Sequence, residues 1–215
     1  MIIAIDGPAG SGKGTLGRRV AAHLSFAYLD TGLLYRAVGA ALLETGAALD
    51  DVAKAEEAAK SLRADAVVSH PRLRTEQAGE AASAVAAMPG VRAALLAFQR
   101  RFAAAPPGGE AGAVLDGRDI GTVICPGADL KLYLTASSEA RARRRFEELR
   151  AAGEPSIYAD ILKQVEERDK RDSGRAEAPL RPADDAIVID TTSLSADDVF
   201  SQVIEKIQAL RSADE

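Results

Sequence analysis

The sequence predicts an α/β fold in which a parallel β-sheet is covered by helices on both faces. Three observations carry this prediction. Short apolar runs alternate with longer stretches of helical periodicity along the 215 residues. A glycine-rich segment, residues 7–14, separates the first apolar run from the first helical stretch. The chain is also long enough for one full hydrophobic core, so we expect a single domain.

Five short apolar runs are expected to be the strands of a five-stranded parallel sheet. Each is short and almost continuously apolar, as a strand buried on both faces should be. The strands are expected at residues 2–6, 26–29, 113–116, 130–134 and 186–190.

Helices are expected wherever apolar residues recur at intervals of three and four. They are expected at residues 15–24, 33–43, 51–64, 76–104, 137–150 and 158–170, and from Ser195 to near the end of the chain. Ser137 or Ser138 is a suitable N-cap for the fifth helix, and Ser195 for the last. Residues 66–69 are expected to form a short strand or an extended segment.

The helical stretch between the second and third strands is too long for a simple crossover connection. We therefore expect an inserted subdomain at about 47–109 and a lid at about 147–160. The core would comprise about 1–46, 110–146 and 161–215. All of these parts belong to one domain.

The composition excludes several classes of protein. Apolar residues make up 47% and charged residues 27%, which is typical of a soluble globular domain. No apolar run has the length of a membrane span, and no basic segment precedes a long apolar one at the start, so we expect a cytoplasmic protein without a membrane partner. A single cysteine and two histidines exclude an internal disulfide and give a zinc site little support. The net charge of −5 argues against nucleic-acid binding, and we expect a monomer.

Residues 7–15 predict a phosphate-binding loop, because glycines let backbone N–H groups converge on phosphate oxygens at the start of a helix. Lys13 is expected to reach the β- and γ-phosphates. In the pattern G-x-x-x-x-G-K-[ST] a hydroxyl follows the lysine and binds Mg²⁺. Here Gly14 intervenes and Thr15 supplies the hydroxyl, in the form G-K-G-T that resembles nucleotide kinases such as adenylate kinase. The expected ATP-binding residues are Gly7, Pro8, Ala9, Gly10, Ser11, Gly12, Lys13, Gly14 and Thr15, with Thr15 as the metal ligand.

Charged motifs follow the second and third strands, at the carboxyl edge of the sheet where α/β proteins bind ligands. Arg36 lies near the start of a helix there and can clamp an acceptor phosphate with two hydrogen bonds. Asp116, Arg118 and Asp119 lie on a glycine-rich loop after the third of the five strands. Asp116 can face the Mg²⁺ shell or the acceptor ribose, and Asp119 also suits a sugar hydroxyl.

Two basic clusters follow the fourth strand. Arg141, Arg143, Arg144 and Arg145 share one helix, where like charges three and four residues apart repel each other unless anions lie nearby. Residues 168–175 form a second, mixed cluster that ends near Gly174. These clusters are either solvated helix faces or groups that close over phosphates.

Together these motifs resemble the bacterial cytidylate kinase family over nearly the whole chain. The resemblance rests on Ile5-Asp6-Gly7-Pro8, the G-K-G-T loop, Asp30-x-Gly32-x-x-Tyr35-Arg36, and the segments 74–92, 116–122 and 168–175. It implies a P-loop NTPase three-layer sandwich that transfers the γ-phosphate of ATP to CMP or dCMP, giving ADP and CDP or dCDP, with Mg²⁺ as cofactor.

The resemblance also implies roles for individual residues. Ser83, Asp172 and Arg175 are expected to read the cytosine edge. Arg36, Arg92 and Arg118 are expected to bind the acceptor phosphate with Arg168 nearby, and Asp119 the sugar. The implied catalytic residues are Lys13, Arg118, Arg168 and Arg144, one of the lid arginines. The implied substrate-binding residues are Thr31, Arg36, Ser83, Arg92, Asp116, Arg118, Asp119, Asp172 and Arg175.

Two features depart from the family pattern. Thr31 stands where many members have Ser, which keeps the hydroxyl and adds a methyl group that tightens the sugar site. The stretch before Arg74 is shorter than in the full-length bacterial pattern. The resemblance implies that the insert at about 47–109 binds the nucleoside monophosphate, and we expect this insert to be reduced in size.

Three other functions stay open at this point. The chain could be another P-loop kinase, for UMP, AMP or shikimate. It could be a non-catalytic ATP-binding module, although such a module needs no second set of phosphate clamps. It could bind nucleic acid through its arginine clusters, against which the acidic balance and the few aromatic residues argue. A GTPase is excluded, because its Asn-Lys-x-Asp motif needs an Asn and the chain has none.

Overall fold

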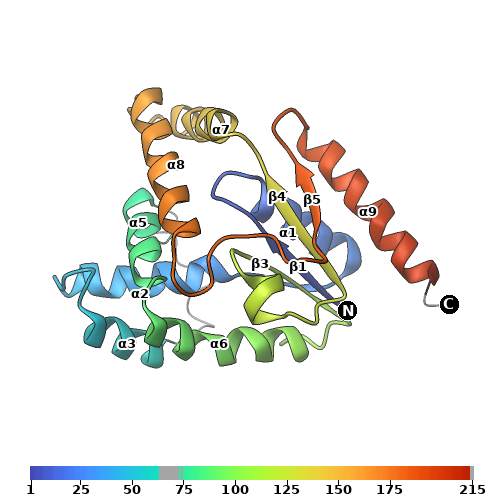
Figure 1. The fold of residues 1–215 in the computed structure, drawn as a ribbon, viewed down its shortest axis with the longest axis horizontal. Coiled ribbons are helices and arrows are strands. Elements are labelled where there is room, and N and C mark those ends of the chain that lie inside the picture. The colour runs from blue at the N-terminus through green and yellow to red at the C-terminus, as the bar shows by residue number, and fades with distance from the viewer. Residues whose placement is uncertain (63–72, 74, 214–215) are drawn as a thin grey trace.

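A five-stranded parallel sheet with helices on both faces forms the centre of the computed structural model, which describes residues 1–62, 73 and 75–213 (Figure 1). The strand order is β2-β3-β1-β4-β5. The strands are β1 (Ile2–Asp6), β2 (Ala27–Asp30), β3 (Ala113–Gly117), β4 (Leu130–Thr135) and β5 (Ile187–Asp190). The predicted fold class is therefore confirmed, and every expected strand lies within two residues of its observed position.

The helices that the structure describes alternate with these strands. They are α1 (Lys13–Leu24), α2 (Thr31–Glu44), α3 (Val52–Ser61), α5 (Glu76–Val85), α6 (Pro89–Ala104), α7 (Ser138–Ala151), α8 (Tyr158–Ser173) and α9 (Ala196–Ala213), with a short π-helix, η2 (Ile120–Ile124). Ser137 caps α7 by accepting a hydrogen bond from the Ala140 N–H, as predicted. Ser195 caps α9 by accepting one from the Asp198 N–H.

Side chains of the central strands β1 and β3 alternate between two apolar layers. Ile3 and Ile5 are fully buried on the face that α1 and α9 cover. Ala4 and Leu115 are fully buried on the other face, against α6 and η2. Two further clusters lie away from the sheet, one among α2, α3, α5 and α6 and one between α7 and α8. Figure 1 shows these two helix groups on either side of the carboxyl edge of the sheet.

One expectation differs from the structure. The helix expected at 76–104 is two helices, α5 and α6, whose axes are bent by 100° at residues 86–88, because Pro89 starts a new helix. The π-helix η2 was not predicted. The segment expected at 66–69 and Arg74 lie outside the described residues.

No single helix in the described ranges is long and apolar enough to cross a membrane. Only Gln77–Val85 and Pro89–Ala104 pass that test, as a bent pair judged by length and composition.

Candidate functional site

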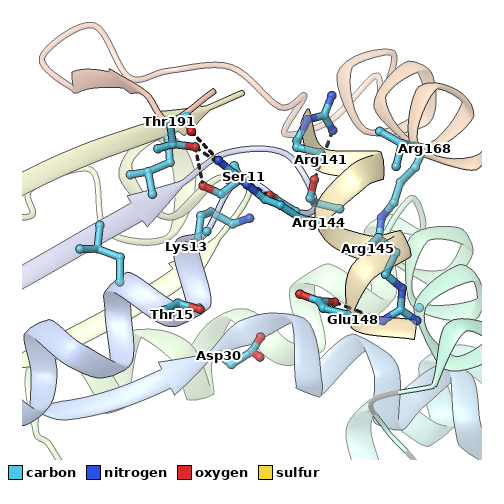
Figure 2. A pocket seen from close by; sticks show the side chains of 18 of the residues that line it. Ser11, Lys13, Thr15, Asp30, Arg141, Arg144, Arg145, Glu148, Arg168 and Thr191 are labelled. Carbon is cyan, nitrogen blue, oxygen red and sulfur yellow. Dashed lines mark hydrogen bonds and ion pairs between the residues drawn. The ribbon is translucent and has the colours of Figure 1, made fainter. Parts of the chain in front are cut away.

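A cleft of about 530 Å³ lies at the carboxyl edge of the sheet (Figure 2). All five strands run parallel, so the loops that follow them meet at this edge. Loop 9–12 and the first turn of α1 line the cleft from the sheet side. Asp30 and Arg36 line it from the α2 side, and α7 and α8 line it opposite.

Contacts with other elements hold the phosphate-binding loop in shape. Gly7 has a φ of +146°, and a Cβ there would lie 2.0 Å from the Leu134 carbonyl oxygen, so only glycine fits. The Ser11 carbonyl accepts a hydrogen bond from the Thr191 hydroxyl at 3.1 Å. The Ala9 and Gly10 carbonyls accept hydrogen bonds from arginines of α7. These contacts fix the carbonyls of the loop, as a preformed anion-binding loop requires.

Lys13 is buried at the start of α1 and lines the cleft, where Figure 2 shows it extending away from the helix. Its ammonium donates a hydrogen bond to the Pro8 carbonyl at 2.8 Å. Burial, together with the Arg118 charge, lowers the pKa of Lys13 to about 7, although Asp116 acts in the opposite direction. The site therefore holds a lysine whose full charge depends on an incoming anion.

Oxygen atoms that could bind Mg²⁺ lie near Lys13, on the side chains of Asp30, Asp116 and Thr15. Burial and the Asp30 carboxylate raise the pKa of Asp116 to about 6. The Tyr28 hydroxyl donates a hydrogen bond to Asp116. Thr15 and Asp30 lie on the same side of the cleft in Figure 2. Mg²⁺ in phosphate-binding sites uses one or two protein oxygens and completes its shell with phosphates and water. This donor set fits that pattern, and the described residues hold no cluster of three His, Cys, Asp or Glu side chains.

Asp172 of α8 is the centre of a second group of predicted residues. Its side chain is 2% exposed. It accepts hydrogen bonds from Arg118 at 3.0 Å, Arg175 at 2.5 Å and Ser83 at 3.3 Å. Burial alone would raise the pKa of Asp172, but Arg118, Arg175 and Arg168 outweigh it and lower the pKa below its usual value. Asp172 is therefore ionised at neutral pH.

Arg168 joins this group to the cleft. Its Nε lies 4.0 Å from the Asp172 carboxylate, and its side chain also lines the cleft beside the phosphate-binding loop. Burial and the neighbouring Arg118 charge lower the pKa of Arg168 to about 10. Cations thus crowd together where the two groups meet, and phosphates would relieve their mutual repulsion.

The other residues that were predicted to bind the acceptor lie next to this group. Arg92 of α6 forms an ion pair with Asp119, which is buried. Arg36 donates hydrogen bonds to the Leu73 and Thr75 carbonyls at 2.8 and 2.9 Å and so holds the chain that leads into α5. The Thr31 hydroxyl donates to the backbone carbonyl of Asp116 at 2.7 Å.

The arginines of α7 have different environments. Arg141 is buried and forms two hydrogen bonds with the Asp169 carboxylate of α8, at 3.0 and 2.5 Å. It also donates to the Ala9 and Ala136 carbonyls at 3.2 and 2.9 Å. Arg144 donates to the Gly10 carbonyl and to Thr191. The anion that Arg141 needs is thus a carboxylate of the protein itself.

Four further residues shape the site, although no role was assigned to them from the sequence. Asp169 was noted only as part of the charged cluster at residues 168–175, and Thr191 gave no usable signal because its partners lie far away along the chain. Tyr28 looked like an ordinary strand residue. Asp6 carried a signal that could have been used, since it is an acid at the end of a buried strand directly before the glycine loop.

Comparisons with known proteins show which family this chain resembles. Residues 3–209 match the family model described as Cytidylate kinase. A Cytidylate kinase of Paramagnetospirillum magneticum (strain AMB-1) is 58% identical over 98% of this chain and 99% of its own. One of Azorhizobium caulinodans is 57% identical over 98% and 100%. The crystal structure of an uncharacterized protein from Eubacterium ventriosum aligns over 97% of this chain and 98% of its own with a TM-score of 0.54 at 16% identity, which supports the fold alone.

Proposed function

The chain belongs to the cytidylate kinase family, and from this premise we propose that it transfers the γ-phosphate of ATP, bound with Mg²⁺, to CMP or dCMP. The donor nucleotide would lie on residues 7–15 and the acceptor in the group around Asp172. The observation that carries this assignment is Arg168, which lines the phosphate-loop cleft and also lies beside Asp172.

The donor side supplies fixed positive charge. The loop N–H groups, the N-terminus of α1 and Lys13 would hold the β- and γ-phosphates. Arg144 lies at the rim of this loop and is assigned to the same phosphates. Thr15 would hold Mg²⁺, and Asp116 would face the shell of ligands around the metal. When bound, Mg²⁺ neutralises charge on the phosphates. The protein's main contribution is to position and stabilise charge, because phosphoryl transfer needs little covalent chemistry from the enzyme.

The acceptor side would hold the monophosphate with Arg36, Arg92 and Arg118. Arg168 then lies between donor and acceptor, where charge spreads over the transferred group. Asp119 and Thr31 would bind the sugar. In the free protein Arg92 pairs with Asp119, and Arg118 with Asp172. The acceptor must therefore exchange these ion pairs for its own phosphate and hydroxyl groups.

Asp172 explains the choice of base. An ionised carboxylate only accepts hydrogen bonds, so it pairs with the amino group of cytosine and opposes the carbonyl that uracil has in its place. Ser83 and Arg175, which contact Asp172, would complete the recognition of the cytosine edge. A site with buried polar groups of this kind discriminates strongly, because the wrong base leaves them unpaired.

The insert and the lid would close over the substrates. We assign the insert to residues 47–109 and the lid to residues 147–160, which comprise the end of α7, the connecting segment and the start of α8. Their closure would exclude water, which otherwise competes for the γ-phosphate.

Substitution of Asp172 tests base reading. With Asp172→Asn the carboxylate becomes an amide that presents a donor as well as an acceptor. We expect kcat/KM for CMP to fall about a hundredfold or more and the preference for CMP over UMP to shrink with it. A coupled assay with ATP and a panel of monophosphates measures both.

Two controls accompany this test. Glu166→Gln, at an exposed position on the same helix, should leave the base preference unchanged. Lys13→Ala should abolish transfer to every acceptor. A CMP to UMP preference equal to that of the unmodified protein in Asp172→Asn would reject the assignment of Asp172.

A further inference from the structure

Asp6, the last residue of β1, connects two loops that are far apart along the chain. Both of its carboxylate oxygens accept backbone hydrogen bonds at 2.8 Å, one from the Ile120 N–H and one from the Gly121 N–H. The side chain is 4% exposed. Asp6 directly precedes the phosphate-binding loop, and Ile120 directly follows Arg118 and Asp119.

The segment that Asp6 holds has an unusual backbone. Residues 120–124 form a π-helix, a rare form that occurs most often at functional sites. The Asp119 carbonyl accepts hydrogen bonds from the Val123 and Ile124 N–H groups at 2.9 and 3.1 Å. The first N–H groups of such a turn have no partner within it, and Asp6 supplies that partner. The backbone at residues 118–119 is thus fixed before these residues by β3 and after them by the hydrogen bonds to Asp6.

A buried carboxylate is an expensive way to hold a loop. Burial raises the pKa of Asp6 to about 6, although the Gly121 and Ile120 N–H groups act against this rise. A neutral Asn at this position would accept only one of the two hydrogen bonds and would point an amide donor at the other N–H. Only a carboxylate satisfies both donors without a rotation of the loop.

We propose that Asp6 is a positioning residue that sets the acceptor-binding loop, residues 117–121, against the donor loop. It acts through Arg118 and Asp119 and does not touch either nucleotide. Because one residue joins both loops, the position of Arg118 and Asp119 relative to the donor loop is set before either nucleotide binds. This inference rests on the function proposed above.

The decisive experiment compares Michaelis constants in Asp6→Asn. The KM for CMP should rise about tenfold, as expected when a buried donor loses its partner, while the KM for ATP changes less than about twofold. Asp129→Asn is the matched control, because Asp129 accepts a hydrogen bond at 2.6 Å from the Ile2 N–H at the opposite end of the same strand. The control should leave both constants unchanged.

A double-mutant cycle separates positioning from general loss of structure. If Asp6 acts through Arg118, the double variant Asp6→Asn with Arg118→Ala should raise the KM for CMP by less than the product of the two single increases. Independent, multiplicative effects would overturn the proposal. So would equal increases in the two Michaelis constants of Asp6→Asn, or no increase in either.

Amide hydrogen exchange of the unmodified protein keeps the proposal testable if Asp6→Asn does not fold. A peptide that covers residues 117–124 should already be protected without nucleotide, and CMP should add little. Protection that appears only with CMP would show that Asp6 does not set the loop in advance. If the proposed function itself were wrong, the unmodified protein would fail to phosphorylate CMP, whatever the exchange data show.

Discussion

Lys13 shows what burial does to a single charged group. Its ammonium hydrogen bonds to a backbone carbonyl, and its neighbour Arg118 is also a cation. The ordinary pKa of lysine is 10.5, and burial beside Arg118 lowers it to about 7. Phosphate groups bring negative charge, which favours the protonated form and raises the pKa again. Donor binding should therefore be coupled to proton uptake.

This coupling can be measured by calorimetry of ATP binding in two buffers with different ionisation enthalpies. At pH 8 Lys13 is mostly neutral in the free protein, so binding should take up close to one proton. At pH 6 it is already protonated, and its contribution should nearly vanish. Lys13→Arg, which stays charged, provides the baseline at each pH. The absence of any difference between the two proteins at pH 8 would contradict the prediction.

The contact between α2 and α5 determines, at the scale of whole elements, where the acceptor residues lie. A Cβ on Gly39 of α2 would lie 2.6 Å from the Ala81 Cβ of α5, closer than packed atoms come. α5 carries Ser83, which contacts Asp172. The absence of a side chain at Gly39 therefore sets the position of a proposed base-reading residue on another helix.

Gly39→Ala should push α5 away from α2. We expect the free energy of unfolding to fall by about 1–3 kcal/mol, the usual effect of overpacking, and the KM for CMP to rise. Urea unfolding and steady-state kinetics measure the two effects. Gly127→Ala is the matched control, because no atom lies within 4 Å of its added Cβ. An unchanged unfolding midpoint in Gly39→Ala would show that the helices separate without cost.

Elements were predictable from the sequence where a local pattern decides them. The five strands that the structure describes are short and largely apolar runs, so each of them was found. The break between α5 and α6 was missed because the Ala-rich periodicity continues across it and Pro89 is compatible with the first turn of a helix. The turn η2 was missed because its first donors bond to Asp6, more than a hundred residues earlier.

The same limit applies to the candidate site. Lys13 and Asp116 lie beside strand ends, so their place at the sheet edge followed from the topology. The pairing of Arg141 with Asp169 depends on how α7 packs against α8, which no local pattern records. The roles assigned to the acceptor residues came from family resemblance and stay predictions.

The proposed donor and acceptor sites meet at Arg168. The lining of the cleft there contains more cationic side chains than carboxylates. A bisubstrate analogue, adenosine and cytidine joined by five phosphates, would supply charge to both groups at once. At a thousand times its Kd it should add about 4 kcal/mol to the free energy of unfolding. That gain corresponds to roughly 8–16 °C in Tm for a chain of this size.

Differential scanning calorimetry can compare this analogue with ATP and with CMP at equal concentrations. The analogue should raise Tm more than either nucleotide does. The corresponding analogue with uridine should raise it less, since Asp172 opposes the uracil carbonyl. If the analogue stabilises the protein no more than ATP does, the two groups do not form one continuous site.

Thr191 completes the phosphate-binding loop from the far end of the chain. Its hydroxyl donates a hydrogen bond to the Ser11 carbonyl, 180 residues earlier in the chain, and accepts a hydrogen bond from the Arg144 side chain. A nascent chain therefore carries the whole glycine motif long before that motif has its final support. The loop therefore gains this support only after most of the polypeptide has left the ribosome, and we expect ATP to stabilise the nearly finished molecule more than its early folding intermediates.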